Sequence, residues 1–233
     1  MIPSTALLLF TKTASQEAAG KQFLRSDKGR SERISRKFIG HSLRCIKQAG
    51  LPYFVISSPK QHGNSFGERL TNAIEEVFSY GYEQVIAIGN DSPQLTSKLL
   101  LHAAHEMSCA DLVLGPDKRG GIYLLGISKK AYSRNELLSF RWNTSKLCSD
   151  FIKWKDKYNL PFSRLPTLKD VNGPDDLQSL LKQKRISLQL LNALLSIIAA
   201  TGAAAIEEII FLKNLSAQNS MGLRGPPVAS LVS

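Results

Sequence analysis

Hydrophobic residues along the chain form two kinds of pattern: short continuous runs, and longer stripes with a spacing of three or four residues. Continuous runs are typical of strands buried on both faces of a parallel sheet, whereas stripes are typical of helices that bury one face. The predicted strands are 6–10, 53–56, 85–88, 111–114 and 121–127. The predicted helices are 31–49, 67–80, 97–107, 144–158 and one that starts at Pro174.

The order of these elements predicts the fold class. Strands and helices alternate through residues 6–88, which indicates an α/β fold with a mostly parallel central sheet and helices on both faces. In such sheets ligands bind beyond the carboxyl ends of the strands. Residues 115–120 are rich in turn formers, and we expect them to join two strands by a tight loop.

The C-terminal part of the chain has a different character. A run of 21 uncharged residues lies between Arg185 and Glu207. Its length is sufficient to cross a bilayer, but polar and small residues lower its hydrophobicity. We therefore expect helices over 186–212 that pack on the domain or on a partner, with a peripheral membrane or oligomer contact as their role. This divides the chain into a domain at 1–184 and a helical extension with a tail at 185–233.

The N-terminus and the cysteines both favour a cytoplasmic protein. The apolar run 6–10 has no basic region before it and no small-residue cleavage site after it, so it predicts a first strand, not a signal peptide. Cys45, Cys109 and Cys148 are widely spaced and indicate neither a zinc site nor a disulfide framework. We expect them to be buried apolar residues in a reducing compartment.

The composition indicates a sizeable hydrophobic core and a net positive charge. The chain has 233 residues, 43% of them hydrophobic, and a net charge of +11. Residues 1–60 contain eleven basic and three acidic residues, which favours a localised anion site; a solvated basic helix face is the alternative. The chain has no ribbon of interleaved aromatic and basic residues, so we expect a nucleotide or nucleotide-sugar partner and no nucleic acid.

A carboxylate follows the predicted strand 85–88. Asp91 lies in the segment Gly89-Asn90-Asp91-Ser92-Pro93, where a proline-stiffened turn leads into the next helix. A hard cation such as Mg²⁺ takes one or two carboxylates together with phosphate oxygens, so one Asp at this place can anchor a metal–nucleotide complex. The alternative is an Asp that caps the turn.

Two other segments offer polar groups near a strand end. Lys118 and Arg119 precede the paired Gly120 and Gly121, which allow a close approach of the backbone to a phosphate; a hairpin turn with surface charges is the alternative.

Further along, Asp170 and Asn172 stand two positions apart on an extended segment. Either offers a second oxygen ligand for a metal, unless this segment only caps the helix at Pro174.

Five blocks of the chain, in their order and spacing, carry a resemblance to a known group. The blocks are 61–70, 89–96, 115–126, 142–144 and 165–177, and the resemblance covers about residues 5–180. The chain resembles bacterial glycosyltransferase-A-like, nucleotide-diphospho-sugar-transferase-like proteins of the radical-SAM/selenodomain-associated transferase type. More distantly it is similar to molybdenum-cofactor and phospholactate guanylyltransferases.

The resemblance implies a Rossmann-like glycosyltransferase-A sandwich in which Asp91 binds Mg²⁺ or Mn²⁺. The position of a second metal ligand matches Asn172, with Asp170 as a further candidate. The chain departs from the group at two places: residues 12–21 stand where most members have a Gly-x-x-Lys-Thr-Arg signature, and Arg119 stands where an acidic residue is frequent.

The leading hypothesis is a metal-dependent glycosyltransferase that uses a nucleotide-diphosphate sugar donor and an acceptor that the sequence does not indicate. The predicted nucleotide-binding residues are Lys12, Lys21, Arg69, Asn90, Gly120 and Gly121. Two alternatives remain open: a guanylyltransferase-like nucleotidyltransferase, and a non-catalytic nucleotide- or partner-binding protein that has lost the phosphate-loop signature.

Overall fold

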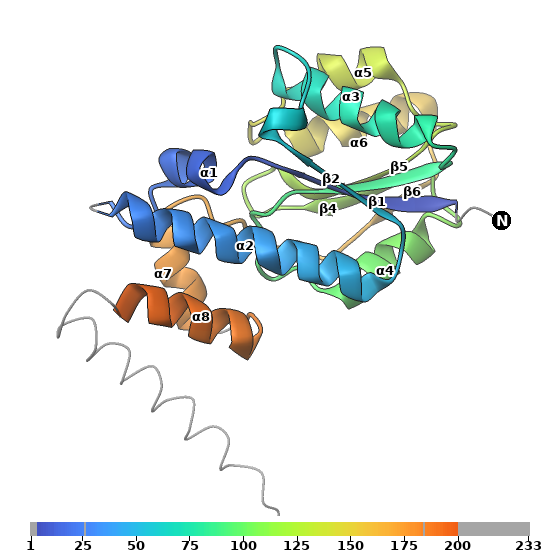
Figure 1. The fold of residues 1–233 in the computed structure, drawn as a ribbon. Helices are drawn as coiled ribbons and strands as arrows, with labels where there is room; N and C mark the ends of the chain where they lie inside the picture. Colours follow the sequence, from blue (N-terminus) through green and yellow to red (C-terminus); the bar gives the residue numbers. More distant parts are fainter. Residues whose placement is uncertain (1–3, 26, 184, 200–233) are drawn as a thin grey trace, which may run out of the picture.

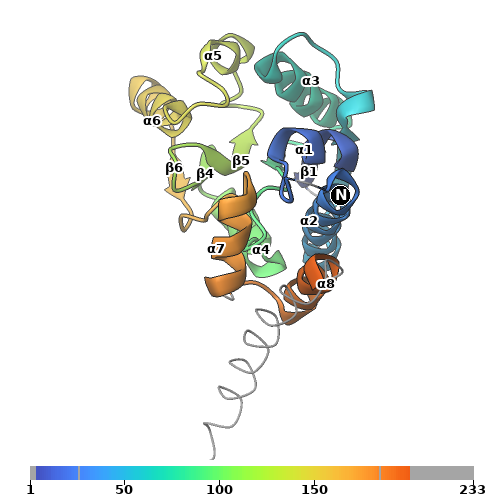
Figure 2. The ribbon, with the colours of Figure 1, turned by 90° about the vertical axis from the view of Figure 1, so that its left-hand side faces the viewer.

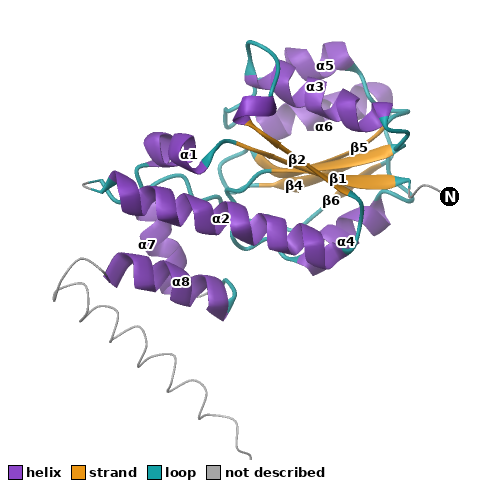
Figure 3. Ribbon diagram, viewed as in Figure 1, coloured by secondary structure: helices purple, strands orange, loops and turns teal. Residues whose placement is uncertain are grey.

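A single six-stranded sheet lies between two layers of helices in the computed structural model, which describes residues 4–25, 27–183 and 185–199 (Figures 1 and 3). The strands are β1 (Thr5–Thr11), β2 (Tyr53–Ser57), β3 (Gln84–Ile88), β4 (Leu112–Pro116), β5 (Ile122–Ser128) and β6 (Phe162–Arg164). Their order in the sheet is β2-β1-β3-β5-β4-β6. β5 runs antiparallel to its neighbours β3 and β4, and the other pairs are parallel. The prediction of a mostly parallel α/β sheet is confirmed.

The helices cover both faces of this sheet. They are α1 (Ala14–Lys21), α2 (Lys28–Ala49), the short 3₁₀ turn η1 (Ser58–Lys60), α3 (Phe66–Ser79), α4 (Ser97–Glu106), α5 (Arg134–Ser139), α6 (Leu147–Tyr158), α7 (Pro174–Gln183) and α8 (Leu188–Ala199). Figures 1 and 2 show α3, α5 and α6 on one face and α2 and α4 on the other. All five predicted strands and all five predicted helices are present, with ends that differ by up to three residues.

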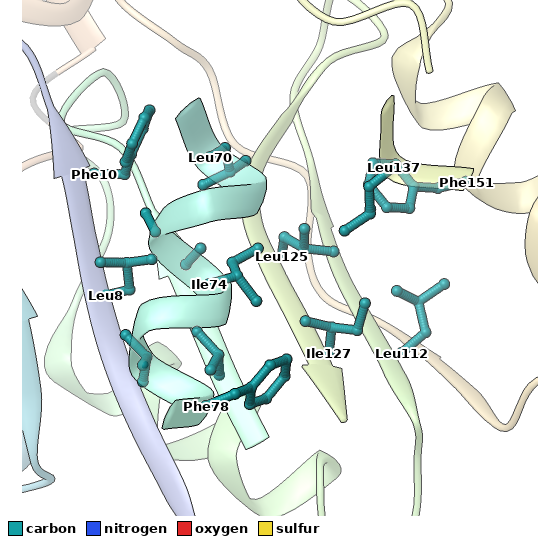
Figure 4. Packing of buried hydrophobic residues seen from close by; sticks show 14 of the residues in the cluster. Leu8, Phe10, Leu70, Ile74, Phe78, Leu112, Leu125, Ile127, Leu137 and Phe151 are labelled. Atoms are coloured by element: carbon teal, nitrogen blue, oxygen red, sulfur yellow. The ribbon is translucent and has the colours of Figure 1, made fainter. Parts of the chain in front are cut away.

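The apolar run of β1 is continuous because helices cover this strand on both faces of the sheet. Leu8 and Phe10 pack in the cluster that contains α3, α5 and α6, as Figure 4 shows for Leu8 and Phe10 beside Leu70 and Ile74. Leu7 and Leu9 point to the opposite face, where they join the cluster with α2 and α4. Successive side chains of a strand alternate between faces, so a strand covered on both sides must be apolar at every position.

The sequence pattern did not predict α1, α5 and β6, nor the short 3₁₀ turn η1. Helix α1 has small apolar residues instead of a stripe, and its start depends on a capping box between Thr13 and Gln16. Helix α5 has only six residues, and β6 has three, of which only Phe162 is apolar. None of these is long enough or apolar enough for a periodic pattern to be visible.

The described part of the C-terminal extension packs on the domain. Helix α8 places Leu190, Leu191 and Leu194 in a cluster with Phe38 of α2 and Leu180 of α7. The prediction of packed helices is therefore confirmed as far as Ala199, whereas 200–212 and the tail lie outside the described residues. Within the described part of the chain, no helix is long and apolar enough to span a membrane.

One expectation about the cysteines is wrong. Cys45 is buried and Cys148 is half-buried, but Cys109 is exposed. Cys109 lies in the turn after α4, where the chain reverses toward β4 and a side chain can point to solvent.

Candidate active site

A cleft of about 640 Å³ lies at the edge of the sheet where β1, β3, β4 and β6 end and β5 begins. This is the edge at which open α/β sheets bind ligands. Eight residues that the sequence indicated as site residues line it: Lys12, Lys21, Arg69, Asn90, Asp91, Gly121, Asp170 and Asn172. They come from loops that are far apart along the chain, and the sheet brings the loops together.

The loop that carries Asp91 is held from both sides. On one side, Thr11 at the end of β1 donates a hydrogen bond of 2.8 Å from its hydroxyl to the Asn90 side-chain oxygen. On the other side, the Val171 N–H donates to the Asp91 carbonyl oxygen at 2.8 Å. Asn90 is 4% exposed, so the oxygen of its amide helps to fix the loop even though the residue lines the cleft.

Lys21 lies against the Asp91 carboxylate. The last turn of α1 brings its ammonium into ion pairs with Asp91 and, at 3.0 Å, with Glu17, and its side chain is only 11% exposed. Burial disfavours the charged form of Lys21, but the two carboxylates outweigh burial and raise its pKa above the ordinary value. The cleft thus contains a positive charge beside the carboxylate of Asp91.

Asp170 is a half-buried residue whose carboxyl group lies among other carboxylates. Ser92 donates a hydrogen bond to it, and burial, together with the negative charges of Asp91 and Asp117, raises its pKa to about 7. Like charges that are held together in this way form a place where a cation is stabilised. Asp170 therefore belongs to the same electrostatic unit as Asp91.

Asp117 is a residue of the cleft that the sequence did not single out. It lies in the loop between β4 and β5, and its carboxylate accepts hydrogen bonds from the N–H groups of Arg119 at 2.5 Å and Gly121 at 3.0 Å. The signal available in the sequence was an Asp three residues before a pair of glycines in a tight loop.

The paired glycines have steric roles in this loop. A Cβ atom on Gly121 would lie 2.5 Å from Asp117 Oδ2, so only glycine leaves room for that carboxylate. Gly120 has a φ of +85°, and a Cβ there would lie 2.0 Å from the Ser145 carbonyl oxygen. Gly120 is not among the residues that line the cleft, which differs from its predicted contact with a nucleotide. Its backbone packs against residues 145–148 instead.

Arg119 lines the cleft but its guanidinium is engaged with α7. It donates two hydrogen bonds of 2.7 Å to the carboxylate of Asp176, and Lys169 lies 3.4 Å from the same carboxylate. Burial acts to raise the pKa of Asp176, but these cations and the Asn172 N–H outweigh it and lower the pKa. Arg119 therefore joins the β4–β5 loop to α7.

The remaining predicted residues lie at the rim of the cleft. Lys12 is exposed directly after β1 and forms none of the ion pairs found among the described residues. Arg69 is half-buried and donates to the carbonyl oxygens of Gly63 and Asn64 at 3.5 and 3.3 Å. Asn172 has an exposed side chain and lies two residues from Asp170.

Another part of the cleft lining is aromatic and polar. Trp142 donates from its indole N–H to the Leu137 carbonyl oxygen at 2.7 Å and lies 5.5 Å from the Phe66 ring, measured between ring centroids. The exposed Thr144 and Ser145 follow it and also line the cleft. This part of the lining offers hydroxyl and backbone groups of the kind that bind neutral polar ligands.

The donor set fits a hard divalent cation only in part. Asp91, Asp170 and Asn172 offer carboxylate and amide oxygens, the ligands that Mg²⁺ and Mn²⁺ prefer. Within the described residues, however, no group of three or more His, Cys, Asp or Glu side chains is arranged to hold a metal ion. A metal here would complete its coordination with water and with oxygens of a phosphate ligand, as Mg²⁺ commonly does in nucleotide sites.

Sequence comparison relates the chain to one family. A family described as an uncharacterized protein conserved in bacteria (DUF2064) matches residues 13–144, which is more than half of the chain. None of the curated proteins matches it.

A crystal structure of a candidate nucleotide-diphospho-sugar transferase from Desulfovibrio desulfuricans G20 has a similar fold. The TM-score is 0.74 at 19% sequence identity, and the match covers 91% of this chain and 97% of the other. At this identity the similarity shows the fold, a mixed α/β architecture like that of nucleotide-diphospho-sugar transferases, and not the activity.

Two other solved structures are more distant. Rv0371C of Mycobacterium tuberculosis H37Rv, solved in complex with manganese, matches with a TM-score of 0.43 and 14% identity over 77% of this chain and 99% of the other. A cytidylyltransferase from Leptospira borgpetersenii serovar Hardjo-bovis (strain JB197) matches with a TM-score of 0.45 and 12% identity over 97% and 99%. Similarities of this size carry no argument about ligands.

Proposed function

The chain belongs to the bacterial family described as an uncharacterized protein conserved in bacteria (DUF2064), and we propose that it is a metal-dependent transferase that uses a nucleotide-diphosphate sugar as donor. The observation that carries this proposal is the convergence of Asp91, Asp117 and Asp170 with Lys21 in one cleft. Carboxylates in this arrangement suit a divalent cation, and the adjacent ammonium suits the phosphates that such a cation accompanies.

Each group has a distinct part in this proposal. Asp91 and Asp170, with Asn172 beside them, would hold Mg²⁺ or Mn²⁺, which would neutralise the charge of a leaving diphosphate. Lys21 and Lys12, which enter the cleft from α1 and from the end of β1, would contact the phosphate oxygens. Arg69 would add a positive charge for the phosphates at the rim of the cleft.

The sugar would lie between the carboxylates and the aromatic and polar part of the cleft lining. The hydroxyls of Thr144 and Ser145 line this part of the cleft and can bond to sugar hydroxyls. The reaction would break the bond between the anomeric carbon and the diphosphate oxygen and form a bond to the oxygen of an acceptor hydroxyl, whose proton would pass to water or to the leaving diphosphate. The fixed geometry of the Asp91 loop would keep the leaving group and the acceptor in line.

Nucleotidyl transfer is a second candidate because the cleft has more cations than a diphosphate requires. Lys12, Lys21 and Arg69 line it, and together with a metal ion they also suit a triphosphate. In that reaction pyrophosphate would leave, whereas sugar transfer releases a nucleoside diphosphate.

A non-catalytic binding protein is a third candidate, favoured by the ion pair between Lys21 and Asp91. If that pair persists when a nucleotide is bound, Asp91 is not available to a metal, and nucleotide would bind equally well without one.

The experiment that tests the proposal is a thermal-shift panel of nucleotide sugars and nucleoside triphosphates, with and without Mn²⁺, followed by product analysis for every compound that binds. Ligands that bind the native state raise its apparent stability. We expect a nucleotide sugar to stabilise the protein in the presence of Mn²⁺ and to be consumed with release of a nucleoside diphosphate. Release of pyrophosphate would establish nucleotidyl transfer instead.

Asp156→Asn is a matched control for Asp91→Asn, because Asp156 is an exposed carboxylate on α6 outside the cleft. The proposal requires that Asp91→Asn lose the Mn²⁺-dependent part of the stabilisation and that Asp156→Asn keep it. Stabilisation by nucleotide that is the same with and without Mn²⁺, and with no turnover, would favour the non-catalytic binding protein.

A further inference from the structure

Helix α2 carries a cationic stripe on its solvent side. Five exposed cations repeat along it at intervals of one to seven residues that keep to one face: Arg33, Arg36, Lys37, Arg44 and Lys47. In an α-helix these positions fall within an arc of about 100°, and the stripe is about 21 Å long. The buried face of the same helix packs on the sheet and on α8 through Ile34, Phe38 and Ile46, so the cations have to face outward.

Most of these charges are not neutralised. Within the described residues, only Arg36 of this stripe forms an ion pair, with Glu32 at 2.5 Å, and Arg36 remains 68% exposed. Arg44 donates a hydrogen bond of 2.7 Å to Gln189, which is uncharged. Arg33, Lys37, Arg44 and Lys47 therefore present a surface of one sign, which is more than solubility requires of a single helix.

The helix beside the stripe is uncharged. Helix α8 lies along α2, as Figures 1 and 2 both show, and its sequence from Leu188 to Ala199 contains no acidic and no basic residue. The Arg44–Gln189 hydrogen bond places the start of α8 next to the stripe. Leu188, the residue before Gln189, is 71% exposed, the largest exposure among the large hydrophobic residues described.

We propose that this α2–α8 face, made of the stripe on α2 and the start of α8, docks on an anionic membrane surface. Cations arranged in a line attract anionic headgroups, and an exposed leucine beside them can enter the interfacial layer. Single-stranded nucleic acid fits the surface less well, because single strands are bound by stacking on aromatic side chains. The exposed aromatic residues in the described part of the chain, Tyr53, Tyr80 and Tyr158, do not belong to α2 or α8. The face contains no residue of the cleft, so the inference does not depend on the proposed reaction.

Sedimentation of the full chain with lipid vesicles tests the inference. The vesicles are phosphatidylcholine alone, or phosphatidylcholine with about a third of phosphatidylglycerol, each at low and high salt. We expect binding to the anionic vesicles only, and weaker binding at high salt. Arg33→Glu with Lys37→Glu should weaken that binding at least about tenfold, because two attractive charges become repulsive.

The control reverses the same number of charges elsewhere. Lys129→Glu with Lys153→Glu changes exposed lysines at the end of β5 and on α6, away from α2, and should keep most of the binding. Leu188→Gln should weaken binding by a smaller factor that does not depend on salt. Thermal unfolding checks that all variants are folded.

Two results would overturn the inference. The first is equal loss of binding in the α2 variant and in the control, which would mean that only net charge matters. The second is binding of a single-stranded oligonucleotide more tightly than of anionic vesicles at the same salt, abolished by the same α2 variant, which would assign the stripe to nucleic acid.

Discussion

The backbone of Val171 is bonded to the backbone of Asp91, with its N–H donating to the Asp91 carbonyl oxygen at 2.8 Å. The two residues are eighty positions apart, and this hydrogen bond fixes the distance between the loop after β3 and the segment that leads to α7. It explains why Asp91 and Asp170 belong to one electrostatic unit. The position of Asp91 is set by main-chain contacts, so its side chain, which is paired with Lys21, is not needed to hold the loop.

Asp91→Ala should therefore leave the fold intact. The loop keeps its bonds to Val171 and, through Asn90, to Thr11, and Lys21 keeps its ion pair with Glu17. We expect the free energy of unfolding to change by less than about 1 kcal/mol, which denaturant titration measures. A loss several times larger would mean that the Lys21–Asp91 pair serves stability in place of ligand binding.

Asp170 should make stability depend on pH. Its pKa is raised from 3.8 in an unfolded chain to about 7 by burial and by the charges of Asp91 and Asp117. The native state therefore keeps a proton that the unfolded state loses between these two values, so this group's contribution is complete below pH 4, decreases as the pH rises, and is lost above pH 7.

The comparison with Asp170→Asn isolates this effect. The variant cannot ionise at this position, so its free energy of unfolding relative to wild type should increase between pH 4 and pH 7 by up to about 1.4 kcal/mol per pH unit, and then level off. Urea titrations across this range measure it. A difference that is the same at every pH would mean that Asp170 is ionised throughout.

The sequence could predict much of the site because its residues follow strands. Asp91 follows a fully apolar run, and Lys12 follows another, so the rule for parallel sheets places both at one edge. Asp117 also follows a strand, β4, but its role depends on the N–H groups of Arg119 and Gly121, which the strand pattern does not predict. The pairing of Arg119 with Asp176 also depends on how α7 packs, which no local pattern encodes.

The fold shows the same limit. Hydrophobic periodicity predicted every element that buries a large apolar face, but it missed α1, which has a capping box and only small apolar residues. The contact between Lys21 and Asp91 was therefore not predicted, since it depends on the turn of α1 that ends at Lys21. Local capping decides this geometry, and hydrophobicity does not.

Lys12→Ala should weaken nucleotide binding if Lys12 contacts a phosphate. Lys12 is exposed at the end of β1 and lines the cleft, so a charge-assisted contact with a diphosphate would be worth on the order of 1.5–3 kcal/mol. Titration of nucleotide at two salt concentrations measures both the affinity and its salt dependence. Equal affinity and equal salt dependence in wild type and variant would leave Lys12 without a role in the site.

Gly120→Ala should destabilise the protein, whereas Gly40→Ala should not. Gly120 has a φ of +85° and lies against the Ser145 carbonyl oxygen, so alanine there would strain the backbone and its Cβ would collide with that oxygen. We expect the free energy of unfolding to fall by about 1–3 kcal/mol. Gly40 lies within α2 with nothing within 4 Å of a Cβ, and alanine there should stabilise by about 1 kcal/mol. Thermal melts of the two variants, made in parallel, should shift in opposite directions; a shared direction would contradict the steric argument.

Leu194→Ala tests whether α8 is part of the domain or a separate extension that begins at residue 185. Leu194 is fully buried in the cluster that joins α8 to α2 and α7, so its truncation should cost about 2–5 kcal/mol. That cluster includes Phe38 of α2, and another side of helix α2 packs on the sheet. The loss should therefore appear in a single unfolding transition of the whole protein. The matched control is Asn192→Ala on the exposed side of the same helix, which should change stability by less than about 0.5 kcal/mol. Circular dichroism during denaturant unfolding measures both. If Leu194→Ala instead produces a separate early transition and leaves the main one unchanged, α8 unfolds by itself, and the boundary at residue 185 divides two independent units.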